Sequence, residues 1–587
     1  MKPLYDAVME YANSFPYAFH TPGHKLGKGF SSGGAFFDVA GFDLTELPET
    51  DNLHYPEGPV KRAQELAAIA FHSARTWFLV NGSTCGVHAM ITAACRPGSK
   101  LIISRDFHMS AYNGMTLACV KPCYTYPPTP RMIRQAADKN PDAVAVYVTR
   151  PSYFGEMCEL EEIVEIAHSR NMRVLVDEAH GAHLVFSEKL PFCAMDAGAD
   201  LCVQSAHKTL VALTQGAYMH ASAEAVKENS LVYRIETALR SIQTSSPSYI
   251  IMSSLDYARE NMQEHGSDEL DRLLFLCEDF YKCMEKAGYG VPLDAIDYGE
   301  APDTTSRGAQ LDSTSHSAAP LDAASKSEAP GATNRGAQPR RVAKSVNGQN
   351  RYRRDITRLV LNTRKIGLTG VMAEAALFNK FNIRIETSDI DNIVMIATIA
   401  DTEEDFRYLK NALYTIANEA RDSETCFGSC AAGYSAAKPG AAGHNAMSPG
   451  ATEPNTACPG ATVPGALKSG VGRDRANGAP GFCFRSSEQP EIADAEWQVF
   501  PENVSAPLCF YDNLHREAQY SALTSAAGMT AAALVTPYPP GIPLLCPGEI
   551  ITPELVEKIV NLLRAGIKIN GIDGENRICV YRFPAGV

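Results

Sequence analysis

The chain has 587 residues, a formal net charge of -14 and 45% hydrophobic residues. This length and apolar content suffice for two or more domains with sizeable cores. The acidic balance argues against nucleic acid or an anionic membrane surface as the main partner, because both require basic patches.

Targeting and redox features point to a cytoplasmic protein. The N-terminus has no basic region followed by a long apolar run, and no stretch reaches the roughly 18 apolar residues that a membrane span needs. The sixteen cysteines are scattered without a C-x-x-C pair. We therefore expect reduced thiols, with neither a disulfide framework nor a zinc site.

In chain order, an N-terminal segment (residues 1–75) precedes a large region (76–297) that alternates short β-rich runs with helical stretches. The runs typical of buried strands are Thr76–Val80, Lys100–Ser104, Ala143–Thr149, Arg173–Asp177 and Leu201–Gln204. Such alternation predicts an α/β fold with a mainly parallel, mixed sheet and helices on both faces.

Two segments, 298–350 and 426–490, are rich in Ala, Gly, Ser, Thr and Pro. They share short repeats, such as the Pro-Gly-Ala-Thr that begins at Pro330, Pro449 and Pro459. The repeats carry no apolar core positions, which argues against a solenoid. Such composition cannot bury enough apolar surface to offset chain entropy, so we interpret both segments as disordered insertions. They divide a smaller C-terminal α/β domain into residues 351–425 and 491–587.

The first chemical signal is Lys208, which follows Ser205-Ala-His207 just after a predicted strand. A lysine at a strand end is an unusual place for a solvated surface charge. Taken alone, however, a loop lysine is more often solvated than catalytic, so the interpretation depends on its neighbours.

The second signal is Asp177, which ends a predicted buried strand. In parallel sheets a carboxylate at this end faces the crevice where ligands bind. Pyridoxal phosphate (PLP) requires such a group, because a carboxylate keeps the pyridine nitrogen protonated and the cationic ring then withdraws electrons from Cα. A metal site built from Asp177, His180 and His183 is the alternative, but no further ligand set is evident.

Two further signals occur upstream, again where predicted strands end. Gly82, Ser83 and Thr84 lead into a helical run, and a glycine turn at a helix N-terminus suits a phosphate. An ordinary helix cap is the alternative. His108 could stack on a pyridine face or be a plain loop histidine. The four signals together, in one α/β region, favour a PLP site.

Several blocks of the chain resemble one known family. The blocks Gly82–Thr84, Asp177–His180 and Ser205–Lys208 look like those of the fold-type I, PLP-dependent ornithine/lysine/arginine decarboxylases. Further blocks similar to that family's motifs are Phe19–Lys25, Asp43–Glu46, Asp51–His54, Pro56–Gly58, Thr244–Tyr249, Pro537–Pro543 and Pro547–Glu549. The resemblance covers nearly all the chain except the two insertions, and the short core is similar to the compact branch of the family.

The resemblance implies an aspartate-aminotransferase-like fold and the PLP-dependent decarboxylation of arginine, lysine or ornithine, with a role in polyamine biosynthesis. It also implies a cytoplasmic homodimer or higher homo-oligomer with active sites at the subunit interface. It implies that Lys208 forms the Schiff base and that Asp177 pairs with the pyridinium nitrogen. His108 would stack on the ring, and His180 would lie near the ring oxygen or the substrate. Lys208 or His207 would return a proton to Cα. Phosphate contacts would come from Ser83, Thr84, Ser205 and His207. Weaker substrate contacts would come from Glu549 and the segment from His20 to Lys25, within one subunit or across a dimer interface.

Departures from the family pattern keep the substrate open. His108-Met109-Ser110 stands where the family has His-Lys-Ser, and Val87 stands where a polar residue is common. A PLP-dependent aminotransferase or aldolase-type lyase remains an alternative, with Arg577 or Arg582 as a possible clamp for the substrate carboxylate. A non-enzymatic PLP-fold interaction protein is the second alternative.

Overall fold

The computed structural model describes residues 1–14, 20–22, 24–30, 39–292, 354–431, 516–537 and 541–582, with backbone only for 423–431. Apart from 424–431, the described residues belong to one compact unit. The predicted insertion at 298–350 lies outside them, as does nearly all of 426–490. The predicted start of the second insertion is too early, because helix α13 (Glu403–Ala431) continues through residues 426–431.

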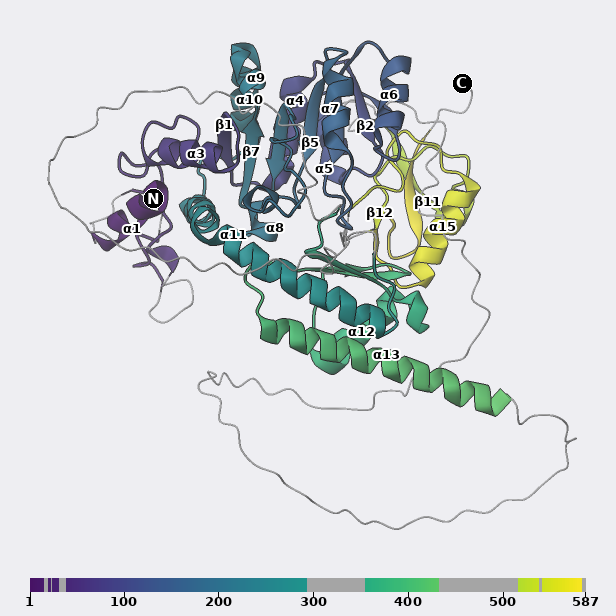
Figure 1. The fold of residues 1–587 in the computed structure, drawn as a ribbon. Coiled ribbons are helices and arrows are strands. Elements are labelled where there is room, and N and C mark those ends of the chain that lie inside the picture. The colour runs from purple at the N-terminus through teal and green to yellow at the C-terminus, as the bar shows by residue number, and fades with distance from the viewer. Residues whose placement is uncertain are drawn as a thin grey trace, which may run out of the picture. The chain divides into compact units, whose positions relative to one another are not determined.

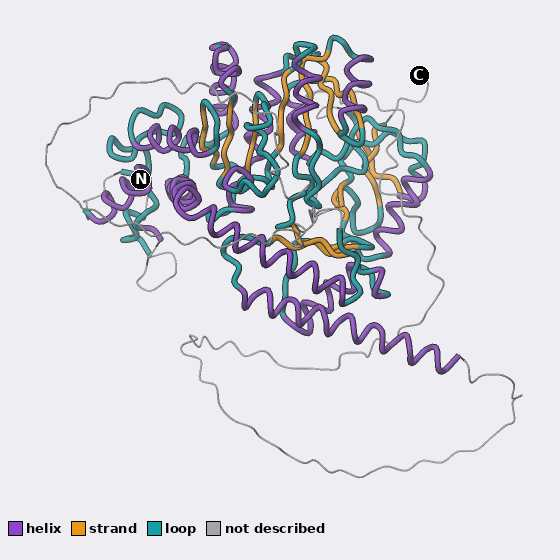
Figure 2. Tube along the Cα trace, in the orientation of Figure 1, coloured by secondary structure: helices purple, strands orange, loops and turns teal. Residues whose placement is uncertain are grey.

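A seven-stranded sheet organises the large region (Figures 1 and 2). Its strand order is β1-β7-β6-β5-β4-β2-β3. The strands are β1 (Arg75–Leu79), β2 (Lys100–Ser104), β3 (Lys121–Thr125), β4 (Ala143–Thr149), β5 (Arg173–Asp177), β6 (Leu201–Gln204) and β7 (Ala217–Ala221). Pairings from β3 to β6 are parallel, whereas β7 runs antiparallel to both β6 and β1. The predicted α/β fold with a mainly parallel, mixed sheet is confirmed.

Apolar side chains on both faces explain the continuous hydrophobic runs of the central strands. In β5, Val174 and Val176 join one buried cluster and Leu175 joins another on the opposite face. Strands that are buried on both sides have no solvent-facing positions to fill with polar residues. The helices of this region include α3 (Pro59–Ala70), α4 (Gly82–Ala94), α5 (Met109–Leu117), α6 (Pro130–Lys139), α7 (Leu160–His168), α9 (Ala223–Lys227), α10 (Asn229–Ile242) and α11 (Tyr249–Lys286).

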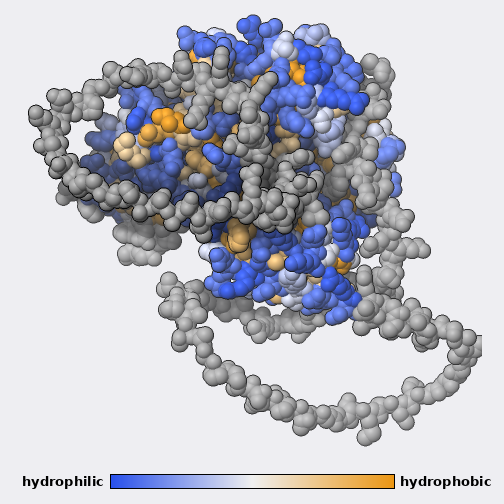
Figure 3. All heavy atoms as spheres, viewed as in Figure 1, coloured by the Kyte–Doolittle hydropathy of each residue, from blue (hydrophilic) through white to orange (hydrophobic). Residues whose placement is uncertain are grey.

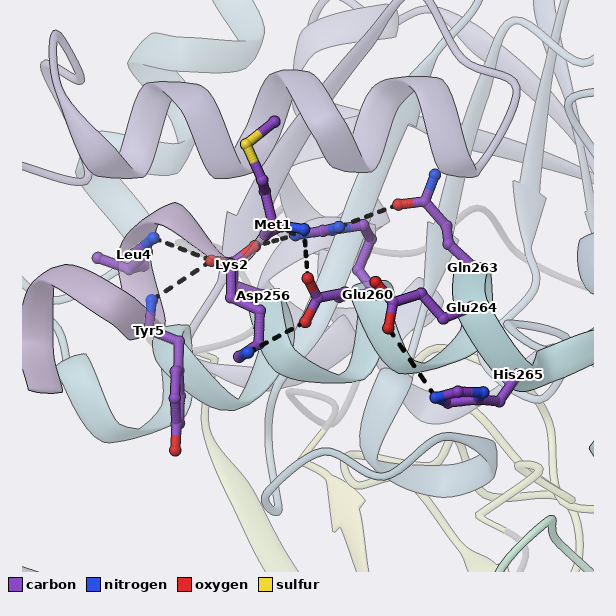
Figure 4. Close-up of polar contacts among 10 residues, drawn as sticks. Met1, Lys2, Leu4, Tyr5, Asp256, Glu260, Gln263, Glu264 and His265 are labelled. Atoms are coloured by element: carbon purple, nitrogen blue, oxygen red, sulfur yellow. Dashed lines mark hydrogen bonds and ion pairs between the residues drawn. The ribbon is translucent and has the colours of Figure 1, made fainter. Parts of the chain in front are cut away.

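The N-terminal helix α1 (Pro3–Asn13) is fastened to α11. Asp256 on α11 accepts hydrogen bonds from the backbone N–H groups of Leu4 at 2.9 Å and Tyr5 at 3.3 Å, which otherwise lack partners at a helix start. Figure 4 shows Asp256 and, one turn further, Glu260 pointing toward the first residues of the chain. Glu260 pairs with the terminal amine of Met1.

The C-terminal part contains a three-stranded antiparallel sheet of order β8-β10-β9, together with two two-stranded sheets, β11-β14 and β12-β13. Its elements are β8 (Arg358–Asn362), α12 (Gly370–Phe381), β9 (Thr387–Ser388), β10 (Asn392–Ile396), α13, β11 (Ala518–Ala522), β12 (Thr536–Pro537), α15 (Pro553–Arg564), β13 (Ile569–Asn570) and β14 (Arg577–Tyr581). Helix α11 contacts both β1 and β8 and so links the two regions.

Figure 3 shows that the described residues on one face of the molecule are largely hydrophilic. This is consistent with the burial of most large apolar side chains in the core clusters. Among the helices of the described ranges, none is both long enough and apolar enough to cross a membrane.

Candidate active site

One cavity of about 380 Å³ opens where the parallel strands end, as expected for ligand sites of α/β sheets. Loop residues after β2, the last residues of β4 and β5, and the short helix α8 (Ala206–Thr209) after β6 supply much of its wall. Its lining is Asn81, Gly82, Ser83, Thr84, Asp106, His108, Thr149, Tyr153, Asp177, Ala179, His180, His207, Lys208, Thr214, Gln215, Glu386 and Ile542.

The N-terminus of α4 forms one wall of the cavity. Gly82 there has a φ of +75°, a conformation that glycine adopts without steric cost. Ser83 and Thr84 follow it, and no side chain caps the helix from the preceding Asn81. A helix start with hydroxyls and no side-chain cap is suited to an anion, since the first backbone N–H groups and the helix dipole both favour negative charge.

Asp177 is held rigidly at the end of β5. It is almost fully buried, and its two carboxylate oxygens accept hydrogen bonds from the Tyr147 hydroxyl and the Ala179 backbone N–H, each at 3.1 Å. Burial raises the pKa of Tyr147 well above its usual value, so this hydroxyl stays a donor. The two donors fix the direction in which the carboxylate faces the cavity.

Lys208 lies half-buried in the same cavity. Its Nζ is 3.1 Å from Nε2 of His180. Burial lowers the pKa of Lys208, although the charges of Asp177 and Glu386 oppose this effect. A lowered pKa leaves a larger neutral fraction of the amine at neutral pH, which is the form that can attack a carbonyl carbon.

His108 is oriented by the helix that it precedes. Its Nδ1 accepts a hydrogen bond from the Ser110 backbone N–H at 3.2 Å, so the proton of the neutral ring resides on Nε2. Burial lowers the pKa of His108, and the charge of Lys208 adds to this effect while Asp177 opposes it. The result is a neutral, fixed imidazole at the cavity wall, as a stacking partner for a flat ring requires.

A line of polar groups leads away from Lys208 along the cavity, and no pattern in the sequence predicts it. The ring of Tyr153 meets that of His180 edge-on at 5.3 Å between centroids. The Tyr153 hydroxyl donates to Oε1 of Glu386 at 2.8 Å. Glu386 is an exposed carboxylate of the C-terminal part that lines the cavity. Its local sequence carries no signal, because only the tertiary fold brings it to this wall.

The three weaker predicted substrate residues do not line the cavity of the described chain. His20 lies 2.6 Å from the Tyr11 hydroxyl, and Lys25 donates to the His20 carbonyl oxygen at 2.5 Å. Glu549 is 1% exposed and is paired with Arg105. The predicted contact between Glu549 and the substrate therefore lacks geometric support, because an arginine already occupies this carboxylate.

The geometry also bears on two alternatives from the sequence, the metal site and the arginine clamp for the substrate carboxylate. His183 pairs with Asp355 at 3.3 Å instead of joining Asp177 and His180, and no metal-binding group of three or more His, Cys, Asp or Glu side chains occurs in the described residues. Arg577 pairs with Asp573, and Arg582 donates to Gln519. Neither arginine lines the cavity.

Comparison with known proteins identifies the family. Residues 2–297 match the model of the Orn/Lys/Arg decarboxylase major domain, and residues 490–571 match that of the C-terminal domain. The chain belongs to the Orn/Lys/Arg decarboxylase family. It is therefore an amino-acid decarboxylase that acts on a basic amino acid, which confirms the predicted family and activity.

The chain is similar to named enzymes over most of its length. It is 27% identical to arginine decarboxylase of Bacillus anthracis, over 97% of this chain and 94% of that protein. It is 30% identical to arginine decarboxylase of Bacillus cereus, over 72% of this chain and 83% of that protein. The fold is that of lysine decarboxylase A from Pseudomonas aeruginosa, with a TM-score of 0.68 at 16% identity, covering 99% of this chain and 80% of the other.

Proposed function

We propose that this decarboxylase works with PLP attached at Lys208 and that its substrate is arginine. The observation that carries the first part is the presence of Lys208 and Asp177 in the wall of one cavity. The second part is supported by the relatives named arginine decarboxylase, which match this chain over most of their own length.

The residues present fit the cofactor. The Ser205 hydroxyl is fully buried without a hydrogen-bond partner in the described structure, which is costly unless a ligand accepts from it. Ser205, His207, Ser83 and Thr84 would hold the phosphate, His108 would cover the ring, and Asp177 would face the pyridine nitrogen. When bound, PLP supplies a protonated ring that withdraws the electron pair left at Cα as CO2 departs.

The chain's own residues have three tasks in this reaction. Asp177 keeps a negative charge beside the ring nitrogen, in an orientation that Tyr147 and Ala179 fix. His180, 3.1 Å from Lys208 Nζ, can hold or accept a proton from that amine. Lys208 or His207, both in the cavity wall, would deliver a proton to Cα after CO2 has left.

Glu386 takes the place that the sequence suggested for Glu549. A substrate attached near Lys208 must direct its distal cation to some other part of the cavity, and Glu386 is a carboxylate in that wall. A guanidinium can bind a carboxylate through two parallel charge-assisted hydrogen bonds. Binding energy from this remote contact can hold the scissile bond perpendicular to the ring.

The decisive test is the Lys208→Ala variant. We expect it to lack the visible absorbance of bound PLP and to release no CO2 from arginine, because the attaching amine is gone. Lys227→Ala, at an exposed lysine that pairs with Glu224, is the matched control and should behave like the wild type. Undiminished turnover of Lys208→Ala would refute the proposal.

Product analysis separates the remaining alternatives. Wild-type enzyme incubated with arginine, lysine or ornithine should give the amine from arginine at the highest rate. A keto acid as the main product would favour transamination, and a colourless protein that binds no PLP would favour a non-enzymatic role. We further propose that the enzyme is a cytoplasmic homodimer or higher homo-oligomer with a role in polyamine biosynthesis. Light scattering measures the oligomeric state, and a monomer would contradict this part.

A further inference from the structure

Arg358, the first residue of β8, is buried without a hydrogen-bond partner. Its exposed fraction is 0%, and none of its three guanidinium nitrogens bonds to any group in the described residues. Burial lowers the pKa of Arg358 to about 10, so the side chain is still a cation at neutral pH. An unpaired buried charge costs several kcal/mol, so this residue is a poor choice for stability alone.

The surrounding chain leaves room for this side chain. A Cβ on Gly155 would lie 2.9 Å from Cβ and 3.2 Å from Cγ of Arg358, closer than side chains pack. Only a glycine therefore allows the stem of Arg358 to pass this turn. The negative charge of Glu386 opposes the lowering of the Arg358 pKa. Glu386 accepts the hydrogen bond of the Tyr153 hydroxyl, and both residues line the cavity.

We propose that Arg358 is a positioning residue for substrate recognition, whose buried charge attracts the Glu386 carboxylate and supports its hydrogen bond with Tyr153. This inference rests on the proposal that Glu386 receives the cationic end of the substrate. Arg358 is buried and is not among the residues that line the cavity. It acts through Glu386, which remains exposed to the cavity and able to accept a guanidinium.

Binding of two amines to the PLP-loaded enzyme tests this role. One is the amine product of arginine decarboxylation, which carries a guanidinium, and the other is an alkylamine of matching length without it. Calorimetry should show that Glu386→Gln weakens binding of the guanidinium amine about 10- to 100-fold, because a charge-assisted contact is lost. Arg358→Met should weaken binding of the same amine about 3- to 30-fold. Neither variant should alter alkylamine binding, and Arg358→Lys should restore most of the loss.

A double-mutant cycle shows whether Arg358 acts through Glu386. In the Glu386→Gln background, Arg358→Met should change the affinity for the guanidinium amine by less than about twofold, because its target is already neutral. Steady-state kinetics with arginine should show a raised KM and a lowered kcat for Arg358→Met, because the remote contact both binds the substrate and orients the scissile bond.

Thermal unfolding separates positioning from a structural role. Arg358→Met should leave the melting temperature unchanged or raise it, because this cation makes no hydrogen bond in the described residues and its burial is costly. The matched control is Arg259→Met, at another fully buried arginine that donates to Gln263 at 3.0 Å and to the Met1 carbonyl at 2.6 Å. This control should lower the melting temperature without changing the preference between the two amines.

The outcomes distinguish two kinds of failure. If Glu386→Gln leaves binding of the guanidinium amine intact, the proposed substrate contact is wrong, and the role of Arg358 falls with it. If Glu386→Gln weakens binding but Arg358→Met does not, only the inference about Arg358 is wrong. If Arg358→Met lowers the affinity for both amines equally and also lowers the melting temperature, Arg358 is a structural residue and the inference is overturned.

Discussion

Arg105 and Glu549 form a buried ion pair that joins distant parts of the chain. An Arg105 guanidinium nitrogen lies 3.3 and 3.4 Å from the two carboxylate oxygens, and both side chains are at most 2% exposed. Arg105 also donates to the Pro543 carbonyl oxygen at 2.8 Å. Because His108 follows closely after Arg105 and Ile542 precedes Pro543, the pair fastens two segments of the cavity wall to each other.

Breaking this pair should destabilise the protein strongly. Arg105→Met or Glu549→Gln each leaves a buried charge without an opposite charge, and we expect a loss of about 3–5 kcal/mol in the free energy of unfolding. The double variant Arg105→Met/Glu549→Leu should recover most of this, since neither charge then remains. Urea unfolding measures all three variants, and single-variant losses below about 1 kcal/mol would contradict the expectation.

Gly155 should tolerate a side chain poorly. Its φ is +86°, and an added Cβ would lie 2.7 Å from the Asp355 carbonyl oxygen. We expect Gly155→Ala to cost about 2–4 kcal/mol, from backbone strain plus this clash. Gly98, with a φ of +82° and no atom within 4 Å of its added Cβ, is the matched control. Gly98→Ala should cost about 1–2 kcal/mol in the free energy of unfolding. Equal losses for the two variants would show that the structure relieves the clash at Gly155.

The carboxylate of Asp177 should matter for catalysis more than for fold. Asp177→Asn keeps the shape but removes the charge, so we expect kcat to fall at least about 100-fold while PLP remains attached. Tyr147→Phe removes a donor to this carboxylate and should cost only about 3- to 10-fold. Steady-state kinetics with absorbance of bound PLP measures both effects. A Tyr147→Phe loss as large as that of Asp177→Asn would assign the main role to the hydroxyl.

Local sequence determined most of the large-domain sheet. The predicted bounds of β2, β4, β5 and β6 match the structure, because strands buried on both faces are unbroken apolar runs. Strand β3 was missed, since Pro122 interrupts its pattern and an edge strand needs less apolar surface. Strand β7 was also missed, because the polar His220 interrupts an otherwise apolar segment, although every residue of the strand is buried.

In the candidate site too, local sequence predicts some residues and not others. Asp177 and Lys208 sit at or just after strand ends, where the order of elements alone places them at one edge of the sheet. Glu386 reaches the cavity only through the packing of the C-terminal part against the large domain. The pairing of Glu549 with Arg105 could not be predicted, because the two residues are 444 positions apart in the sequence. Such long-range pairs leave no local pattern from which to predict them.

His220 should make stability depend on acidity. Its ring is fully buried, with its nitrogens 2.8 Å from the Thr76 hydroxyl and 3.1 Å from the Gln204 side-chain oxygen. Burial lowers the pKa of His220 from 6.5 to about 3. Between these values the unfolded chain binds a proton that the folded chain does not. Its contribution to the free energy of unfolding is therefore complete above pH 6.5 and is lost by about 1.4 kcal/mol per pH unit as the pH falls toward 3.

Urea unfolding at several pH values between 8 and 5 tests this expectation. His220→Gln should lower stability at pH 8, because the fit to Thr76 and Gln204 is lost, but should flatten the decline below pH 6.5. His265→Gln is the control, since that side chain is 63% exposed and should leave the decline unchanged. If His220→Gln retains the full wild-type slope below pH 6.5, some other buried group must account for the protons that the unfolded chain takes up.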